Sequence, residues 1–457
     1  MGRDLGNGMQ LARPPKHLRK HLQLAETHTI FTNMNMPVAT DPSTNSFRRP
    51  FELPTLIAWF GCAVLLVSLV VLVDHPPLNE RTDFSVTYIG SRMVYLRMGA
   101  GVYDLAEQEK LKKSLLPDAQ PLIFEHPPFE ALLLAPLGAL PYKTAYLIWG
   151  LINVVIWLSL AHLLRPYATV PRDDAAYLLL WLMFLPLWAA LFEGQSSLVM
   201  FLLYALTFIE LRSGRELRAG AVFGLALFKF QFAIPFVLIL LLQRRWKFVQ
   251  GFLGTTSGLG LLSLLAVGWQ GVLAYIHLIL AIATHPESAS YGNAIGMATV
   301  GGFVHPLLGQ TLGHAAASLF IAGISIGLLI LTAYKWSKTG LASDARKFDL
   351  MFAAAVVVSL TTSLHMFTPD LSPLLLAMLL VVRYFPGRAH SWLRIMLALP
   401  LVMFWMPPLF FVLLTRHWFY LWFPVLMSFL AGVVKLAAMA PERIAAFSIA
   451  DSAPGSL

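Results

Sequence analysis

The sequence predicts an all-α polytopic integral membrane protein, and two observations lead to that fold class. Hydrophobic residues occupy 57% of the 457 positions and charged residues only 12%, about half of the roughly 25% that soluble domains carry. Apolar runs of about 20 residues, the length that crosses a bilayer, recur along the chain. This composition cannot form a water-facing surface, so a soluble enzyme, a disordered chain and a fibrous protein are excluded.

The charge balance and the cysteine count narrow the choice further. The net charge is +9, from 33 Lys and Arg against 24 Asp and Glu. In a membrane protein, cytoplasmic basic loops facing anionic lipid headgroups explain such an excess, so we expect no nucleic-acid partner. The single cysteine, Cys62, lies inside an apolar run, which excludes a disulfide framework and a cysteine-based metal site.

The two ends of the chain are polar and differ from its middle. Residues 1–50 are polar and basic, and the first apolar run begins at Leu53. We interpret residues 1–50 as a flexible basic cytoplasmic arm rather than a signal peptide. Residues 51–440 are the expected transmembrane domain, and residues 441–457 the expected cytoplasmic tail.

The first membrane span is predicted at residues 53–73, with Arg48 and Arg49 before it and Asp74 after it. Basic residues favour the cytoplasmic side, so this span leads outward. A long polar stretch follows, interrupted by a short apolar piece at residues 128–140 that we expect to lie at the membrane interface. Further spans are predicted at residues 144–164, 175–192, 196–211, 248–268, 311–334, 348–364, 371–384, 395–414 and 418–436. The expectation is a bundle of about 10–12 transmembrane helices whose long first extracytoplasmic loop carries interfacial helices.

The apolar segment 219–242 has basic residues on both sides. A single span would place one of the two basic clusters outside, against the usual distribution. Two half-helices meeting near Lys229 and Phe230 would return the chain to the same side instead. Broken helices are tolerated at membrane depth where they are buried in protein or line a cavity, so we predict a polar cavity near Lys229. Both termini are then cytoplasmic. The flanking basic residues are Arg212, Arg215, Arg218, Arg244, Arg245 and Lys247.

Polar residues from separate loops are predicted to share the extracytoplasmic side, where such groups mark functional sites. Their convergence between helices is typical of a binding site. Lys229 stands out because an ammonium between half-helices needs an anionic or carbonyl partner. The candidates are Asp83, Arg92, His126, Gln195, Lys229, His365, Asp370 and Arg416.

Several of these residues also have simpler explanations. Asp83 would serve equally as a loop carboxylate or a helix cap, and Asp104 as a local turn or cap residue. His126 precedes two prolines, as a packed turn residue would, and Gln195 would fit the start of a helix. No phosphate-binding glycine-rich loop, zinc spacing or nucleophile elbow occurs in the sequence.

Six short motifs follow one another in a recognisable order. Asp-Phe-Ser-Val-Thr-Tyr occupies residues 83–88, Gly-Ala-Gly-Val-Tyr-Asp residues 99–104, and Phe-Glu-His-Pro-Pro-Phe residues 124–129. Gly194-Gln195, the segment 219–229 ahead of Arg-Arg-Trp, and the segment 365–371 come next. Over about residues 53–380 this order resembles glycosyltransferase family 87, the polyprenol-phosphate-mannose-dependent α-mannosyltransferases. His126 stands where that family often has an aromatic residue.

The resemblance implies a GT-C fold and a catalytic carboxylate in the first outer loop, which here is Asp83. It implies transfer of a hexose, with mannose favoured, from a polyprenyl-phosphate co-substrate to a glycan or glycolipid acceptor. The site would face the extracytoplasmic side of a bacterial-type plasma (inner) membrane. No cofactor is implied; a divalent metal shared by Asp83, Asp104 and Asp370 stays open but is not favoured.

The chemistry of such a transfer gives each candidate a role. Asp83 would take the acceptor hydroxyl proton in one inverting displacement. The leaving phosphate needs positive charge or hydrogen-bond donors, and Lys229 and His365 are favoured because their neighbours are apolar. The remaining candidates for binding donor phosphate or substrate are Arg92, Gln195, Asp370, His126 and Arg416.

A secondary transporter of a small polar or anionic solute is the alternative. Transporters also have broken helices, a charged midplane residue and converging polar groups. They usually contain an internal repeat, and the long first outer loop of this chain has no counterpart in its second half. A structural membrane protein would need no carboxylate cluster.

Overall fold

The computed structural model describes residues 53–74, 80–168, 174–284, 297–337, 344–386 and 391–439. The expected arm at residues 1–50 and the expected tail at residues 441–457 lie outside these ranges. Across the described part of the chain, all regular structure is helical and no strand occurs. The all-α prediction is therefore confirmed.

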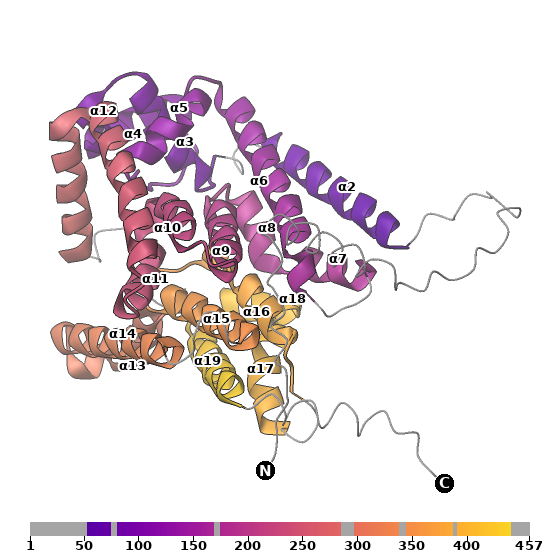
Figure 1. Ribbon diagram of the computed structural model, residues 1–457. Helices are drawn as coiled ribbons and strands as arrows, with labels where there is room; N and C mark the ends of the chain where they lie inside the picture. The colour runs from indigo at the N-terminus through magenta and orange to yellow at the C-terminus, as the bar shows by residue number, and fades with distance from the viewer. Residues whose placement is uncertain are drawn as a thin grey trace, which may run out of the picture. The chain divides into compact units, whose positions relative to one another are not determined.

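The first predicted span is the helix α2 (Leu53–Val73), and a group of short helices follows it. These are α3 (Phe84–Tyr95), the 3₁₀ helix η1 (Gly99–Tyr103), α4 (Leu105–Leu115) and α5 (Pro128–Gly138). In Figure 1 the labels α3, α4 and α5 lie together beside one end of α12. The Gln108 side chain ties this group together: it donates to the carbonyl of Val102 at 2.8 Å and accepts from the amide of Phe124 at 2.7 Å.

The rest of the chain forms a helical bundle. Its elements are α6 (Tyr142–Leu164), η2 (Arg165–Tyr167), α7 (Asp174–Leu182), α8 (Leu185–Phe192), α9 (Ser197–Arg212), α10 (Glu216–Gly224), η3 (Leu225–Lys229), α11 (Phe230–Leu242), α12 (Trp246–Thr284), α13 (Val300–Leu312), α14 (His314–Ser337), α15 (Ala345–Thr361), η5 (Thr368–Leu371), α16 (Leu374–Val382), α17 (Ser391–Phe404), α18 (Pro407–Thr415), η6 (Phe419–Leu421) and α19 (Trp422–Ala438).

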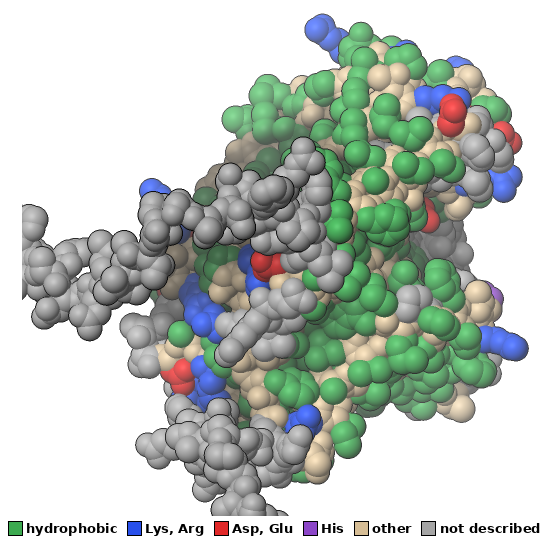
Figure 2. All heavy atoms as spheres, turned by 90° about the vertical axis from the view of Figure 1, so that its right-hand side faces the viewer, with side chains coloured by type: hydrophobic (Ala, Val, Ile, Leu, Met, Phe, Trp, Pro, Cys, Tyr) green, Lys and Arg blue, Asp and Glu red, His purple; other side chains and the backbone are tan. Residues whose placement is uncertain are grey.

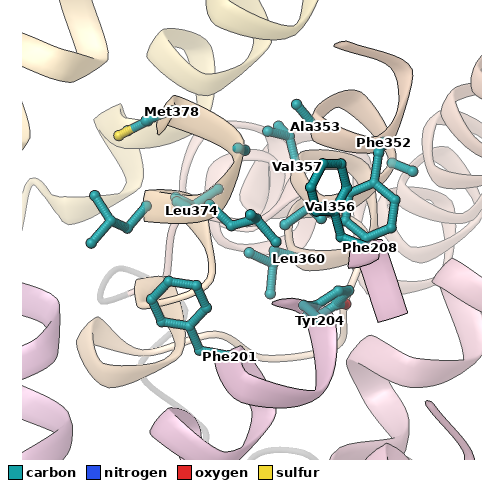
Figure 3. Packing of buried hydrophobic residues seen from close by; sticks show 14 of the residues in the cluster. Phe201, Tyr204, Phe208, Phe352, Ala353, Val356, Val357, Leu360, Leu374 and Met378 are labelled. Atoms are coloured by element: carbon teal, nitrogen blue, oxygen red, sulfur yellow. The ribbon is translucent and has the colours of Figure 1, made fainter. Parts of the chain in front are cut away.

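The centre of the bundle lies where α9 meets α15 and α16. Figure 3 shows Phe201, Tyr204 and Phe208 of α9 beside apolar side chains of the other two helices. Every residue from Phe348 to Thr361 of α15 is buried, as expected for a helix that is apolar all round. The hydroxyl of Tyr204 finds a partner in Ser359 Oγ at 2.8 Å, which links α9 to α15 by a buried hydrogen bond.

Fewer helices reach full membrane length than the 10–12 expected. By length and composition, five described helices could cross a bilayer, or six if α7 and α8, bent by 51°, count as one. The predicted span at residues 395–414 is likewise divided, into α17 and α18 on either side of a break before Pro407, since proline lacks the amide that continues a helix. Among the described side chains on the face seen in Figure 2, hydrophobic ones predominate, as a lipid-facing surface requires. Length and composition alone select Tyr142–Tyr167, Glu216–Leu242, Trp246–Ile282, Ala315–Ser337 and Phe419–Ala438, and of these Glu216–Leu242 is not a straight helix.

The segment Glu216–Leu242 folds back on itself, as the flanking basic residues predicted. A straight helix of this length would hold its ends about 40 Å apart. Arg245 Nη1 nevertheless lies 3.1 Å from Glu216 Oε1, so the end of the segment returns to its start. The ring centroids of Phe223 in α10 and Phe236 in α11 are 4.7 Å apart, which shows the two arms packed together. The predicted hairpin of two arms that meet near Lys229 is confirmed.

Lys229 lies at the turn of this hairpin, with non-helical backbone angles of φ −115° and ψ 62°. A polar cavity was expected here. Instead the side chain is only 6% exposed, because other polar side chains fill the space around its ammonium group. The hairpin thus places a buried cation inside the bundle.

α12 extends beyond its predicted end at residue 268. Gly268 has φ 71°, a backbone conformation open to glycine, and Figure 1 shows α12 turning sharply along its length. The part beyond the turn contacts the first-loop helices, since the ring of Tyr275 lies 5.2 Å from that of Tyr103. The segment of α12 beyond the turn therefore supports the group of short helices next to Asp83 and His126.

Candidate active site

Asp83 is fixed by the turn between α8 and α9. It precedes α3, yet its side chain makes no helix-capping hydrogen bond. The amide Nε2 of Gln195 donates to its carboxylate instead. The following backbone amide, of Phe84, donates to the carbonyl of Glu193 at 2.9 Å. The helix-cap explanation of Asp83 therefore does not describe its contacts.

Two aromatic side chains of α6 hold the same turn in place. The hydroxyl of Tyr146 donates to the carbonyl of Phe192 at 2.6 Å, and the indole of Trp149 donates to the carbonyl of Gly194 at 2.7 Å. Gly194 has φ 62°, where side chains are disfavoured, and a Cβ there would lie 2.7 Å from that of Phe84. Glycine at this position allows Gln195 to approach Asp83.

Lys229 is surrounded by three oxygen-bearing side chains. Its ammonium pairs with the carboxylate of Asp370 and donates to Ser197 Oγ at 2.9 Å and to Gln195 Oε1 at 3.2 Å. Lys229 is 6% and Asp370 4% exposed. Burial of a charge is costly unless it is paired and hydrogen-bonded, and this set of partners meets both conditions.

These contacts form one connected chain from Asp83 to Asp370. The amide of Gln195 is oriented by both neighbours, because its oxygen faces the ammonium of Lys229 and its nitrogen faces the carboxylate of Asp83. Four elements contribute: the start of α3, the turn before α9, η3 and η5. Segments far apart in the sequence thus converge on one buried polar centre.

His365 is adjacent to this chain but is not a cation at neutral pH. Its Nε2 lies 3.1 Å from Nε2 of Gln231. Burial lowers the pKa of His365 to about 4, and the neighbouring Lys229 acts in the same direction. His365 is therefore neutral near pH 7, so it would meet a phosphate as a hydrogen-bond donor and not as a cation.

His126 forms a pair with Glu130, a residue that the sequence candidates did not include. His126 Nδ1 lies 2.8 Å from Glu130 Oε2, and Glu130 is 6% exposed. The signal that would have found it is the closeness of the two residues in sequence, since His126 directly precedes the N-cap Pro127 of α5 and Glu130 lies in the first turn of that helix. Burial opposes the charged form of His126, but Glu130 outweighs it and the pKa is raised.

The carboxylates around Asp83 are harder to ionise than usual. Burial raises the pKa of Asp83, and the hydrogen bond from Gln195 and the charge of Lys229 only partly offset this. Burial and the charge of Asp83 raise the pKa of Glu193 to about 7. Burial likewise raises the pKa of Glu125 to about 7, again with a contribution from Asp83. Near neutral pH, small changes in proton concentration alter the charge of this centre.

Two candidates lie apart from the polar centre. Arg92 donates to the carbonyl of Gly138 at 2.9 Å, and its guanidinium carbon is 5.5 Å from the ring of Tyr95. Arg416 is exposed between α18 and η6. The structure therefore does not bring these two cations to Asp83.

The carboxylates considered for a shared metal do not meet either. Asp104 is exposed and caps α4, accepting from the amides of Ala106 and Glu107 at 2.8 and 3.1 Å. Asp370 is engaged with Lys229. Within the described ranges, no group of three or more His, Cys, Asp or Glu residues has an arrangement suited to a metal ion.

Fold and site together define a multi-pass helical membrane protein with a half-buried acid and amide beside a buried lysine. The model of glycosyltransferase family 87 matches residues 124–369. This range is more than half of the chain, so the protein belongs to glycosyltransferase family 87, a GT-C membrane family, and is a transferase with a sugar donor and an acceptor as substrates. Comparisons with curated proteins and with solved structures gave no match. The matched range includes His126, Gln195, Lys229 and His365, and Asp83 precedes it.

Proposed function

We propose that this protein transfers a hexose, with mannose favoured, from a polyprenyl-phosphate donor to a hydroxyl group of a glycan or glycolipid acceptor. The reaction is a single inverting displacement, and Asp83 is the base. The observation that carries this proposal is the hydrogen bond from Gln195 to Asp83, in a cluster that also contains Lys229.

The proposed base needs to be both ionised and fixed in direction. The acceptor oxygen forms its bond to the anomeric carbon as Asp83 takes the hydroxyl proton, and the bond between that carbon and the phosphate oxygen breaks. Positioned bases contribute typically 10²–10⁴-fold to a rate. Gln195 directs the carboxylate, and the charge of Lys229 favours its ionised form.

Lys229 is proposed to act on the donor by its electrostatic field. Its ammonium already has Asp370, Ser197 and Gln195 as partners. A fixed cation in a site that excludes water stabilises the negative charge that develops on a leaving phosphate. Asp370 and Ser197 then serve to hold Lys229 at a constant position while substrates enter and leave.

The residues at the two ends of α9 support an extracytoplasmic site. Ser197 at its first residue contacts Lys229, whereas Arg212 at its last residue pairs with Asp349. Sixteen helical residues separate these ends by about 24 Å. Basic residues gather on the cytoplasmic side, so we propose that the Arg212 end is cytoplasmic in a bacterial-type inner membrane and that both termini share that side.

Asp83→Asn tests the proposal directly. Purified protein would be supplied with labelled polyprenyl-phosphate-mannose and with membrane glycolipid as acceptor, and transfer would be followed by chromatography. We expect the rate to fall by about 10²–10⁴-fold while thermal unfolding stays near that of the wild type. Asp118→Asn is the matched control, because Asp118 is an exposed carboxylate in the same loop. Near-normal transfer by Asp83→Asn would exclude Asp83 as the base.

A further inference from the structure

The described polar centre holds few positive groups that are free to meet an anionic donor. Lys229 is paired with Asp370, and His365 is neutral near pH 7 because its pKa is about 4. A polyprenyl-phosphate sugar carries one negative charge, and its phosphate gains another as the bond to the sugar breaks. Asp83, itself anionic, adds to this charge. The reaction therefore requires a further hydrogen-bond donor or cation beside the phosphate.

His126 is held rigidly at this centre. Its Nδ1 faces Glu130 at 2.8 Å, and its backbone carbonyl accepts from the hydroxyl of Tyr103 at 2.8 Å. Its ring stacks on that of Phe124, with centroids 5.5 Å apart and planes 15° from parallel. Pro127 follows it and fixes the backbone at φ −59° and ψ 147°. The imidazole thus has one well-defined orientation. Nδ1 faces Glu130, and Nε2 points away from Glu130.

The charge of His126 acts on the proposed reaction centre. It is one of the groups whose charge shifts the pKa of Asp83 downward and that of His365 downward. Its side chain is 27% exposed, whereas that of Glu130 is 7% exposed. A buried carboxylate behind a partly open imidazole is the arrangement that fixes which ring nitrogen carries a proton.

We propose that His126 donates a hydrogen bond from Nε2 to the leaving phosphate of the donor, and that Glu130 is the positioning residue that holds it there. This inference rests on the proposed function. Glu130 accepts the hydrogen on Nδ1, which keeps the ring in place and favours its protonated form. No proton need leave His126: the phosphate oxygen takes the electron pair of the broken bond, and the Nε2–H group stabilises it.

The groups facing His126 come from every element around it. Glu130 of α5 favours the imidazolium, and so does Glu125 beside it, while Lys229 of η3 opposes it. Asp83 before α3 interacts with it by charge, and the charge of His126 helps to keep His365, before η5, neutral. Tyr103 contacts its carbonyl, and the ring of Tyr275 in α12 lies against Tyr103. Glu130 makes the shortest of these contacts with the ring, so it is the partner whose charge matters most.

The pH dependence distinguishes this role from a structural one. Because Glu130 raises the pKa of His126, the imidazolium persists to higher pH and is lost as the pH rises through that pKa. Activity should therefore decline on the alkaline side. Glu130→Gln keeps the size and a hydrogen bond but removes the charge, so the alkaline decline should move to lower pH.

The experiment measures transfer from labelled polyprenyl-phosphate-mannose between pH 5 and 9 for wild type, Glu130→Gln, Glu130→Asp and His126→Gln. We expect Glu130→Gln to raise the donor KM by about 10- to 100-fold, the range for a hydrogen bond to a charged group, and to shift the alkaline decline downward. Glu130→Asp should restore part of both. Glu107→Gln, which changes an exposed carboxylate of α4, is the matched control.

Each outcome separates the two proposals. If the wild type transfers hexose but Glu130→Gln keeps both the donor KM and the pH profile, the role of Glu130 is overturned and the proposed function stands. If the wild type transfers no hexose from this donor, the proposed function itself is overturned. The double variant Glu130→Gln with His126→Gln tests the pairing: a combined loss equal to the product of the two single losses would show independent effects and contradict the pair, whereas a combined loss no larger than that of His126→Gln alone supports it.

Discussion

Gln195 and Asp83 are joined by a side-chain hydrogen bond although 112 positions separate them in the sequence. The same amide accepts from Lys229 at 3.2 Å, so the positive charge of Lys229 reaches Asp83 through one intervening group. An amide placed between a cation and an anion has its two ends fixed by both. The position of the proposed base therefore depends on the hairpin that carries Lys229 as much as on α3.

Replacing Gln195 by Glu should impair transfer more than replacing it by Ala. The carboxylate of Gln195→Glu would face Asp83, and like charges sharing a site raise one pKa strongly. We expect kcat to fall by about 10²-fold or more, since the base would be partly protonated or misdirected. Steady-state kinetics at fixed pH would measure this, with Gln250→Glu, at an exposed site of α12, as control. A smaller loss for Glu than for Ala would contradict the role assigned to the amide.

Breaking the Lys229–Asp370 pair should destabilise the protein, and removing both charges should restore part of the loss. Removal of one partner of a buried ion pair costs about 3–5 kcal/mol because the other charge is left uncompensated. We expect Lys229→Met and Asp370→Asn each to lower the melting temperature in detergent. The double variant should lose less than the sum of the two single decreases in melting temperature. Strict additivity of the three melting shifts would show that the ion pair contributes no coupling.

Local sequence signals predict most helices of this fold. They predict only some of the residues that form the candidate active site. The apolar run at residues 53–73 is α2, and the repeated basic clusters gave the hairpin, because both signals are local. Arg92 was expected at the site only because it was predicted to lie on the extracytoplasmic side of the membrane. Nine helical residues place it roughly 13 Å along α3 from Asp83, where it binds Gly138.

Which side chains meet across the bundle depends on packing that the sequence does not display. Glu130 was missed because a single carboxylate in an interfacial helix carries no distinctive pattern, although its spacing from His126 was readable. The sequence left open whether His365 supplies a positive charge or a hydrogen-bond donor, and its burial beside Lys229 shows it to be neutral near pH 7. In the described part of the chain, bends such as that between α7 and α8 divide apolar runs into shorter helices, and a bend leaves the hydrophobic pattern of the sequence unchanged.

Activity should fall on the acidic side at a pH above the ordinary range for an aspartate. The proposed base works only when ionised, and burial raises the pKa of Asp83 above its usual value of 3.8. As the pH falls through that raised pKa, Asp83 is protonated and transfer is lost. The hydrogen bond from Gln195 lowers the pKa, so Gln195→Ala should move the acidic decline to still higher pH. The pH dependence of kcat/KM measures both limbs, and an acidic decline at or below pH 3.8 in the wild type would contradict the prediction.

The re-entrant hairpin should tolerate almost no side chain at Gly220. A Cβ there would lie 1.9 Å from the carbonyl oxygen of Phe248, so Gly220→Ala forces α10 away from α12. Overpacking typically costs about 1–3 kcal/mol. Since α10 leads directly to Lys229, the displacement should also weaken the contact with Gln195 and lower the transfer rate.

Gly254→Ala is the matched control for Gly220→Ala, because nothing lies within 4 Å of a Cβ at that position of α12. Alanine is favoured over glycine inside a helix by about 1 kcal/mol, so this variant should be as stable as the wild type or more so. Melting temperature and transfer rate, measured together for both variants, test the argument. Were Gly220→Ala to match Gly254→Ala in both, the close contact between α10 and α12 would not be needed to hold Lys229 at the site.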